Sequence, residues 1–365
     1  MGMQLEEIQA QVHAASASAT PLQLRGHGSK AFYGEAPRGV VLDLSEFSGI
    51  SSYEPSELVV TVKAGTPITE LEQMLAERQQ HLAFEPPRFK GPGGQGTVGG
   101  MVATGLSGPA RASMGALREH VLGVTLLNGR AEVLSFGGTV MKNVAGYDIS
   151  RLIAGSMGIL GVILEVSLKV LPRPVAQATL RFELGQEQAL QQLNRWGGQA
   201  LPLNASAWWD GALLLRLAGA QAAVDAATRT LGGEPIDTAL AEPFWQGLRD
   251  HHDEFFQGAE RALEHGAKLW RLSLPQTAPA LTHLHGEQLI EWGGAQRWVT
   301  TALPGRQIRE AAAQVGGHAT LFRAADKSAG AFAPLSAPIK QLHQRLKKSF
   351  DPQGIFNPGR LYGDL

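Results

Sequence analysis

The chain has 365 residues, a formal net charge of −1 and 44% apolar residues. This length exceeds that of a usual single domain, so we expect two domains. The balanced charge excludes a general electrostatic attraction to nucleic acid or to an anionic membrane. The sequence has no cysteine, which excludes disulfides, cysteine-bound zinc, a thiol nucleophile and an iron–sulfur cluster bound by cysteines of this chain.

Residues 1–19 have the pattern of an amphipathic helix, with Leu5, Ile8 and Val12 on one face. The segment lacks the basic start and the apolar centre of a signal peptide. No run of 18 apolar residues occurs anywhere in the sequence, so we expect no membrane span.

The first half of the chain is predicted to be rich in strands. Strand-like runs occupy residues 22–25, 40–44, 58–62 and 162–171. Two further runs, 121–127 and 130–136, flank Asn128-Gly129 and predict a hairpin with a type I′ turn. Small residues at 97–104 favour a closely packed helix. Pro172 and Pro174 then mark a domain boundary.

The second half alternates strand-like and helix-like segments, which predicts an α+β domain with helices on one side of a sheet. The predicted strands are 178–184, 212–217, 268–274, 296–301 and 319–323, and the predicted helices are 186–196, 221–231, 243–261 and 306–315. A basic amphipathic helix at 335–350 precedes a tail of turn residues. We therefore expect domains at 1–172 and 173–334, with 335–365 returning to the first domain.

Glycine is concentrated in one part of the sequence. The 71 residues from Gly91 to Gly161 hold 17 of the 44 glycines. Glycine permits positive φ and lets a backbone approach a ligand closely. The count alone fits either tight turns or a ligand site, so the order of the residues has to distinguish them.

The segment 25–31 is a candidate anion-binding loop. Its Gly26-x-Gly28-x-x-Ala31 resembles a dinucleotide fingerprint, but Gly34 and Pro37 follow where a helix should begin, which disfavours a Rossmann unit. Arg25 and Lys30 supply positive charge, and the glycines expose backbone N–H groups. The segment by itself is equally consistent with a surface turn.

Two later motifs are more specific. Residues 142–148 read Lys-Asn-Val-Ala-Gly-Tyr-Asp, and glycines then recur at 155, 158 and 161 before an apolar strand. Together with Arg25-Gly26-x-Gly28-Ser29-Lys30, Thr97-Val98-Gly99-Gly100 and the closing 356–359 Phe-Asn-Pro-Gly, they resemble the FAD-binding domain of the vanillyl-alcohol-oxidase and p-cresol-methylhydroxylase (PCMH) superfamily. Within it, the chain is similar to the FAD-binding E subunits of bacterial glycolate oxidases.

This resemblance implies an α+β fold, with a PCMH-type FAD-binding domain of two subdomains followed by an α+β cap domain with an antiparallel sheet. It also implies the residues that bind FAD. These are a pyrophosphate loop (Arg25, Gly26, His27, Gly28, Ser29, Lys30), residues of the second subdomain (Thr97, Val98, Gly99, Gly100, Gly105, Ser107, Gly108), flavin neighbours (Ser113, Gly115), and residues along the adenosine and ribityl part (Gly158, Gly161, Val162). Ser29 stands where some members have a covalently linking histidine, so we predict non-covalent FAD.

Three arginines of the second domain, Arg271, Arg297 and Arg323, lie on predicted strands beside aromatic residues. Arginine in such a place can hold a carboxylate, which makes them candidate catalytic or substrate-binding residues. An ion pair or a contact with a partner subunit explains them slightly better, because no general base accompanies them.

No metal site is predicted. The related catalytic chains carry His-x-Gly-Asp-Gly-Asn-x-His, which this sequence lacks. His283 and His285 lie in a segment that reads as helical, where a surface role is favoured. His251 and His252 are adjacent, and adjacent side chains on a helix point about 100° apart, so we do not expect them to share a metal.

The resemblance implies a FAD-containing subunit of a glycolate-oxidising or D-2-hydroxy-acid-oxidising complex. Its partners would be a homologous FAD-linked catalytic subunit and an iron–sulfur subunit that passes electrons to quinone. We expect a cytoplasmic protein, held at the inner face of the membrane only through those partners. Two alternatives stay open, a self-sufficient hydroxy-acid dehydrogenase and a structural flavoprotein without turnover.

Overall fold

The structure, a computed structural model, describes residues 3–139 and 148–365. Its first 172 residues form a series of short helices and strands. The helices are α1 (Leu5–Ser18), α2 (Ile68–Glu77), α3 (Val98–Thr104), α4 (Arg111–Met114), α5 (Leu117–His120) and α6 (Ile149–Ile153). The strands are β1 (Leu22–Arg25), β2 (Val40–Asp43), β3 (Ile50–Glu54), β4 (Val59–Lys63), β5 (Gln80–His81), β6 (Val121–Leu127), β7 (Val133–Gly137), β8 (Val162–Lys169) and β9 (Leu171–Pro172).

An antiparallel sheet with the order β3-β4-β8-β6-β7 is the centre of this part. Strand β8 is its middle strand, and six of its eight residues are buried. Helices α2 and α3 pack on this sheet through apolar residues three or four positions apart, including Ile68, Leu71 and Met101. The predicted small-residue helix at 97–104 is thus present as α3.

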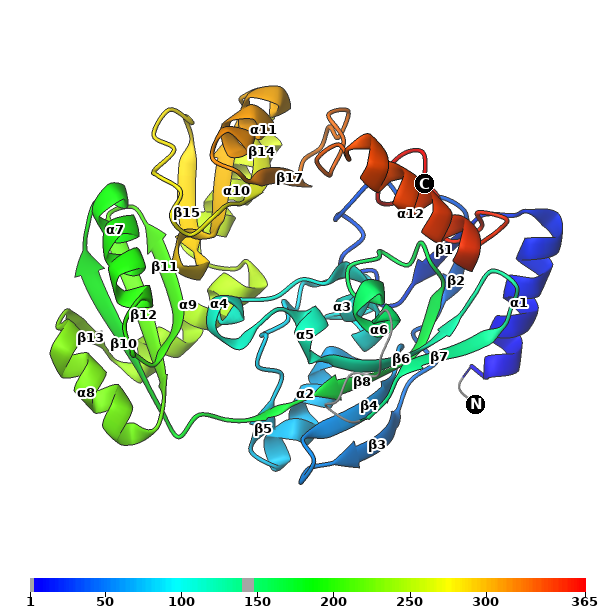
Figure 1. Cartoon of the computed structure of the whole chain (residues 1–365), viewed down its shortest axis with the longest axis horizontal. Helices are drawn as coiled ribbons and strands as arrows, with labels where there is room; N and C mark the ends of the chain where they lie inside the picture. The colour runs from blue at the N-terminus through cyan, green and yellow to red at the C-terminus, as the bar shows by residue number, and fades with distance from the viewer. Residues whose placement is uncertain (1–2, 140–147) are drawn as a thin grey trace.

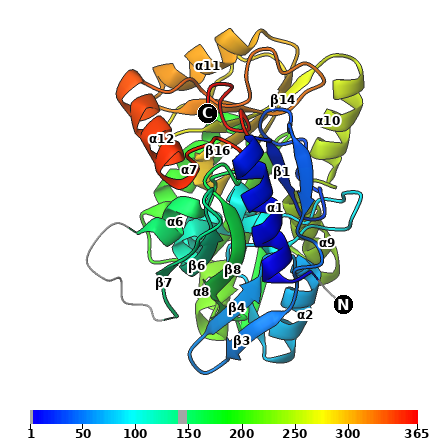
Figure 2. The same cartoon turned by 90° about the vertical axis from the view of Figure 1, so that its right-hand side faces the viewer.

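A smaller unit lies at the edge of this sheet (Figure 1, blue). Strands β1 and β2 pair in parallel, and α1 packs against them through Ile8 and Val12, which are fully buried. Figure 2 shows α1 crossing in front of β1. This confirms the amphipathic helix predicted at the N-terminus.

The remainder of the chain forms a larger antiparallel sheet with the order β13-β10-β12-β11-β15-β16-β14-β17. Its strands are β10 (Ala176–Glu183), β11 (Leu203–Trp209), β12 (Ala212–Gly219), β13 (Glu234–Ile236), β14 (Lys268–Ser273), β15 (Glu287–Glu291), β16 (Gln296–Thr301) and β17 (His318–Arg323). The helices are α7 (Gln186–Gly197), α8 (Gln221–Leu231), α9 (Thr238–Asp250), α10 (Glu254–Glu264), the short η1 (Trp292–Gly294), α11 (Gly305–Gln314) and α12 (Ala337–Phe350).

Helices cover both faces of the eight-stranded sheet, so the prediction of helices on one side is wrong. Helices α7, α8 and α11 pack on one face, where Leu193 and Ile308 are buried. Helices α9 and α10 pack on the other, with Trp245 and Phe256. Both faces of β14 are apolar, since Leu269 and Trp270 point to opposite sides, and a strand buried on both faces needs cover on each.

Two local predictions also need correction, and several strands were missed. The predicted helix at 243–261 is two helices, because His251 takes a left-handed φ of 58° and ends α9. The segment 281–286 is a turn rather than a helix. Strands β3, β11 and β15 were not predicted, and in β3 and β15 the polar and apolar residues do not alternate clearly.

The hairpin of β6 and β7 is present, but its type I′ turn is not. The connection runs from 128 to 132, and the left-handed residue is Ala131, with a φ of 59°. The Asn128 Oδ1 accepts from the backbone N–H groups of Arg130 and Glu132, which holds the longer loop. Gly129 is required for another reason: a Cβ there would lie 2.7 Å from Asp351 Oδ1.

The C-terminal segment crosses back onto the first part of the chain, with α12 and the tail close to β1 (Figure 1, red and blue). All strands of the five-stranded sheet precede residue 172, and all strands of the eight-stranded sheet follow it. This distribution supports the boundary at 172, and the boundaries at 172 and 334 stay a prediction.

A buried ion pair holds the C-terminal segment against the first part of the chain. The Lys347 Nζ donates to Asp351 Oδ2 at 2.7 Å and to the carbonyl oxygens of Ile159 and Phe356. The Asp351 carboxylate also accepts from the backbone N–H groups of Ile355 and Phe356. Asp351 is fully buried. Each of the two charges has several hydrogen-bond partners, which offset the cost of burying it. The pair links α12, the tail and the loop before β8.

We expect Lys347→Met to destabilise the protein by about 3–5 kcal/mol, because it leaves the Asp351 carboxylate buried without its cation. Lys348→Met is the matched control, since Lys348 is the exposed next residue of the same helix, and it should change stability by less than about 0.5 kcal/mol. Urea unfolding of both variants measures the difference. Equal midpoints would contradict the assigned role of the pair.

Candidate functional site

A deep cavity lies where three distant segments meet: the loop after β1, helix α3 and the loop before β8. Its empty volume, counted together with the part open to solvent, is about 890 Å³. Residues 23–31 form one wall, Thr97 to Thr104 another, and Met157 to Ile163 a third.

The walls come close to one another because glycines stand at their contacts. A Cβ on Gly26 would lie 2.3 Å from Thr97 Oγ1. Gly158 has a φ of 72°, and a Cβ there would lie 2.8 Å from Asn357 Nδ2. Any larger residue at these two positions would push the walls apart. Part of the glycine excess therefore shapes the cavity.

The charged side chains that line the cavity are positive. Arg25, Lys30 and Arg360 line the cavity, and the described residues of the lining include no aspartate or glutamate. Arg25 pairs with Asp43 at 2.7 Å, and Arg360 donates to the carbonyl oxygens of Ala31 and Glu35. Among the described residues, none accepts a hydrogen bond from the buried Lys30 Nζ.

Burial lowers the pKa of Lys30 to about 8, although Asp250 acts in the opposite direction. The free-energy cost of burying the ammonium group is offset when an anion binds beside it. His27 Nδ1 is a second buried polar atom of the same loop without a hydrogen-bond partner. Both observations point to a polar, negatively charged ligand at residues 27–30.

The C-terminal tail supplies residues that sequence reasoning did not place in the site. Asn357 Oδ1 accepts from the Leu24 N–H at 2.8 Å, and its Nδ2 donates to the Met157 carbonyl at 2.7 Å. It therefore ties two walls together. Asn357 and Arg360 both line the cavity. The sequence signals were the Phe-Asn-Pro-Gly motif of the family resemblance and the expected return of residues 335–365 to the first domain, and neither assigned a role in the site to Asn357 or Arg360.

Most of the predicted FAD-binding residues line this cavity, namely Arg25, Gly26, His27, Gly28, Ser29, Lys30, Thr97, Gly99, Gly100, Gly158 and Gly161. The others lie behind it or beyond it. Val98 and Val162 are buried in the apolar cores, and Gly105 ends α3 with a φ of 64°. Ser113 donates to the Asn204 carbonyl, and Gly115 packs against Glu119.

Ser107 and Gly108 line a second, smaller cavity between the two parts of the chain. Arg271 lines it too, whereas Arg297 and Arg323 do not. Residues 142–147 of the Lys-Asn-Val-Ala-Gly-Tyr-Asp motif are outside the described residues. Asp148, its last residue, accepts from the Arg151 N–H and caps α6.

Two of the three candidate arginines have structural partners. Arg297 is completely buried and donates to the carbonyl oxygens of Ala278 and Gly294. These contacts occupy its guanidinium and favour a structural role, and the substrate-binding role of Arg297 stays a prediction. Arg323 pairs with Glu260 at 2.9 Å and lies over the Phe32 ring, which matches the alternative of an ion pair.

The residues present fit FAD. Closely approaching backbones, the unpaired Lys30 and the absence of acidic side chains among the described lining residues suit a cofactor that carries a pyrophosphate. Within residues 3–139 and 148–365, no group of three acidic or histidine side chains could hold a metal ion. Over the same residues, no helix is both long and apolar enough to cross a bilayer.

Comparisons with known proteins agree with this assignment. The model of the FAD binding domain family matches residues 3–137. The glycolate oxidase subunit GlcE of Escherichia coli is 46% identical over 97% of this chain and 96% of that protein. The solved structure of an alkyldihydroxyacetonephosphate synthase has a TM-score of 0.66 at 17% identity, and covers 97% of this chain and 74% of its own. This last likeness shows the fold alone.

Two partial relatives share only part of their length with the chain. The D-lactate dehydrogenase of Anaerostipes hadrus is 34% identical over 39% of this chain and 29% of its own length. The glycolate oxidase subunit GlcD of Bacillus subtilis is 28% identical over 48% of this chain and 37% of its own length. The near full-length match to GlcE sets the assignment: the chain carries a FAD-binding domain and belongs to the family of the glycolate oxidase subunit GlcE.

Proposed function

We propose that the protein is the FAD-binding subunit of a complex that oxidises glycolate or a related D-2-hydroxy acid. The observation that carries the proposal is the acid-free cavity with the unpaired Lys30, in a chain 46% identical to a glycolate oxidase subunit. FAD accepts two electrons from such a substrate and can pass them on singly.

The chain's own residues would bind and orient the cofactor. Lys30 and the backbone N–H groups of residues 26–29 would hold the pyrophosphate. Gly158 and Gly161 would leave room for the adenosine and ribityl part, and Asn357 would hold the two facing walls at a fixed separation.

We propose that a homologous FAD-linked subunit oxidises the substrate and that an iron–sulfur subunit receives the electrons. The partial match to a GlcD subunit supports the first partner. The absence of cysteine supports the second, since this chain cannot bind such a cluster through thiolates. Such partners would also account for a location at the inner face of the membrane.

Removal of the Lys30 charge should weaken FAD binding. We expect Lys30→Met to raise the Kd for FAD by about 10- to 100-fold, the range for a lost hydrogen bond to a charged group. Lys90→Met is the control: Lys90 is exposed and lies outside the cavity. Titration of the FAD-free chain, followed by flavin fluorescence, measures both. Equal affinities would show that Lys30 does not contact the cofactor.

FAD binding should also depend on pH. The Lys30 pKa of about 8 in the FAD-free chain rises when the pyrophosphate binds, because the cofactor selects the ammonium form. Affinity should thus be constant below about pH 8 and fall by up to about tenfold per pH unit above it. Lys30→Met should remove this dependence. A dependence that persists in the variant would assign it to another group.

The cofactor should be non-covalent. Precipitation of the holoprotein in acid or in chloroform–methanol is expected to release all the yellow colour, because Ser29 stands at the position of the linking histidine. Colour that stays on the washed polypeptide would contradict this prediction and would direct attention to His27.

The proposal and its two alternatives differ in when the flavin is reduced. We expect glycolate, added without oxygen, to bleach the flavin of this chain only within the complex. Rapid bleaching of the isolated chain would support a self-sufficient dehydrogenase. If the flavin of this chain stays oxidised in the complex as well, its role is structural. Absorbance of the isolated and the assembled protein decides between these outcomes.

A further inference from the structure

The loop that follows the candidate pyrophosphate loop, residues 31–35, is held by the second part of the chain. The loop consists of turns and bends, so no helix or strand fixes its backbone. The segment between β17 and α12, residues 325–332, lies against it (Figure 1). There the Ala331 N–H donates to Glu35 Oε1 at 2.6 Å. The position of this loop therefore depends on residues far later in the sequence.

Lys327 makes the central contact between the two segments. Its Nζ donates to the carbonyl oxygen of Phe32 and, at 2.6 Å, to that of Gly34. Hydrogen bonds from a charged donor are stronger than those between neutral groups. Arg360 donates to the two carbonyl oxygens that flank this pair, those of Ala31 and Glu35. The carbonyls of Phe32 and Gly34 are thus left to Lys327.

The aromatic side chains of the loop are fixed from the eight-stranded sheet. The Arg323 guanidinium lies over the Phe32 ring, 4.1 Å from its centroid, and Phe32 packs edge-on against Phe322 at 5.5 Å. The Tyr33 hydroxyl accepts from Arg271 Nη2 at 3.1 Å. Such contacts set the orientation of the rings. Backbone and side chains of the loop are therefore both held by the second part of the chain.

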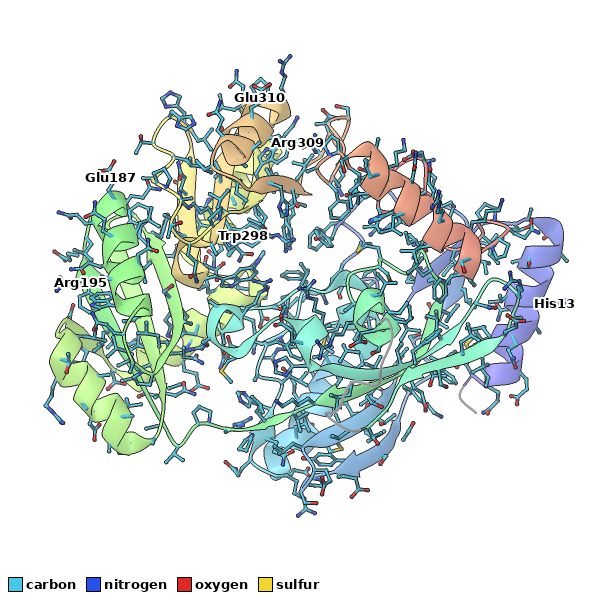
Figure 3. All side chains as sticks on the ribbon, viewed as in Figure 1. His13, Glu187, Arg195, Trp298, Arg309 and Glu310 are labelled. Carbon is cyan, nitrogen blue, oxygen red and sulfur yellow. The ribbon has the colours of Figure 1, made fainter. Side chains whose placement is uncertain are left out.

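The segment 325–332 is itself held in place. Arg309, labelled in Figure 3, belongs to α11 and donates to three carbonyl oxygens of the segment, those of Ala329, Gly330 and Phe332. The Ser328 N–H and hydroxyl donate to the Asp326 carboxylate at 2.8 and 2.9 Å, which closes the turn around Lys327. The segment therefore presents Lys327 in a fixed direction.

The position of the loop is passed on to Lys30. The Tyr33 N–H donates to the Lys30 carbonyl oxygen, and the Ala31 N–H donates to that of Gly28, both at 3.1 Å. These two turns overlap, so a displacement at Phe32 also displaces Lys30. The Lys30 Nζ has no hydrogen-bond partner within the described part of the chain, which leaves its place dependent on this backbone.

We propose that Lys327 is a positioning residue for the cofactor: it holds the loop that presents Lys30, and it thereby couples FAD binding to the docking of residues 325–332. Lys327 does not line the cofactor cavity, so it acts on FAD through the loop. Coupling between two sites is reciprocal. A docked segment favours FAD binding, and bound FAD stabilises the docked segment. The contact of Lys30 with FAD in this argument rests on the proposed function.

Hydrogen exchange of the unaltered chain, with and without FAD, tests the coupling. In residues 326–332, the N–H groups of Ser328, Gly330 and Ala331 are hydrogen-bonded within the contact. We expect bound FAD to slow their exchange at least about threefold. Helix α8, on the opposite side of the molecule from β1 (Figure 1), is the control and should not change. Equal exchange in both states, or equal slowing in α8, would overturn the inference.

A variant without the ammonium group tests Lys327 directly. We expect Lys327→Met to raise the Kd for FAD by about 3- to 30-fold, the usual range for residues that couple two sites. Lys268→Met is the matched control, because Lys268 pairs with Asp326 of the same turn at 3.7 Å and its described contacts do not include residues 31–35. Its Kd should stay within about twofold of the unaltered chain. Equal Kd values for the two variants would overturn the inference.

A double variant shows whether Lys327 acts through Lys30. In a chain that already carries Lys30→Met, the further change Lys327→Met should alter the Kd by less than about twofold, because the group that Lys327 positions is gone. A residue that only supports the fold would give fold-changes that multiply. That result, in variants shown to be folded by thermal unfolding without FAD, would remove the positioning role.

The inference and the proposed function fail separately. If Lys327→Met binds FAD as the unaltered chain does, while glycolate reduces the flavin within the complex, the inference is lost and the proposed function stands. Conversely, protection of residues 326–332 by FAD and coupled variants, in a complex whose flavin glycolate does not reduce, would keep the inference and remove the proposed function.

Discussion

The cofactor cavity depends on one constraint, which is that the last residues of the chain hold together segments from its first half. Asn357 bonds to Leu24 and to Met157 through the two ends of one amide, so the separation of these walls is set by a single side chain. The Lys347–Asp351 pair fixes the tail from which Asn357 projects. Because this pair is buried and fully hydrogen-bonded, the tail cannot shift without exposing an unpaired charge. The geometry of the cavity therefore follows from the docking of residues that are distant in sequence.

The same constraint explains which parts of the site could be predicted. The loop at residues 25–30 carries its own signal, since charge, hydroxyl and glycines follow one another along the chain. Arg360 has no such sequence signal, because its place at the cavity depends on hydrogen bonds to the carbonyl oxygens of Ala31 and Glu35, which are distant in sequence. Sequence motifs report local backbone requirements, whereas a lining residue contributed by a distant turn depends on tertiary packing. The resemblance to a family located the first kind of residue and missed the second.

In the fold, too, some features were predictable from the sequence and others were not. Periodicity predicted most helices and strands, but not the cover on both faces of the eight-stranded sheet, although the sequence of β14 already has apolar residues on both of its faces. The break at His251 was also missed, since a non-glycine residue with a φ of 58° has no clear sequence signal. Here the packing of the ring on Phe256 outweighs the cost of a left-handed backbone, about 1–2 kcal/mol. That break turns His251 away from α9 and toward the second cavity.

Among the described residues, Lys30 and Arg271 have no ion-pair partner, and each lies near a ring of the same aromatic cluster. Lys30 Nζ is 5.6 Å from the Phe89 centroid, and Arg271 is 5.7 Å from that of Phe322. These two rings are themselves 6.4 Å apart. Ring faces attract a cation and fix its position without cancelling its charge. Carboxylates in the same places would have stabilised the empty protein and weakened the attraction for anions. The rings instead leave the Lys30 charge available at the cofactor cavity, at a cost in stability that an anionic cofactor would offset on binding.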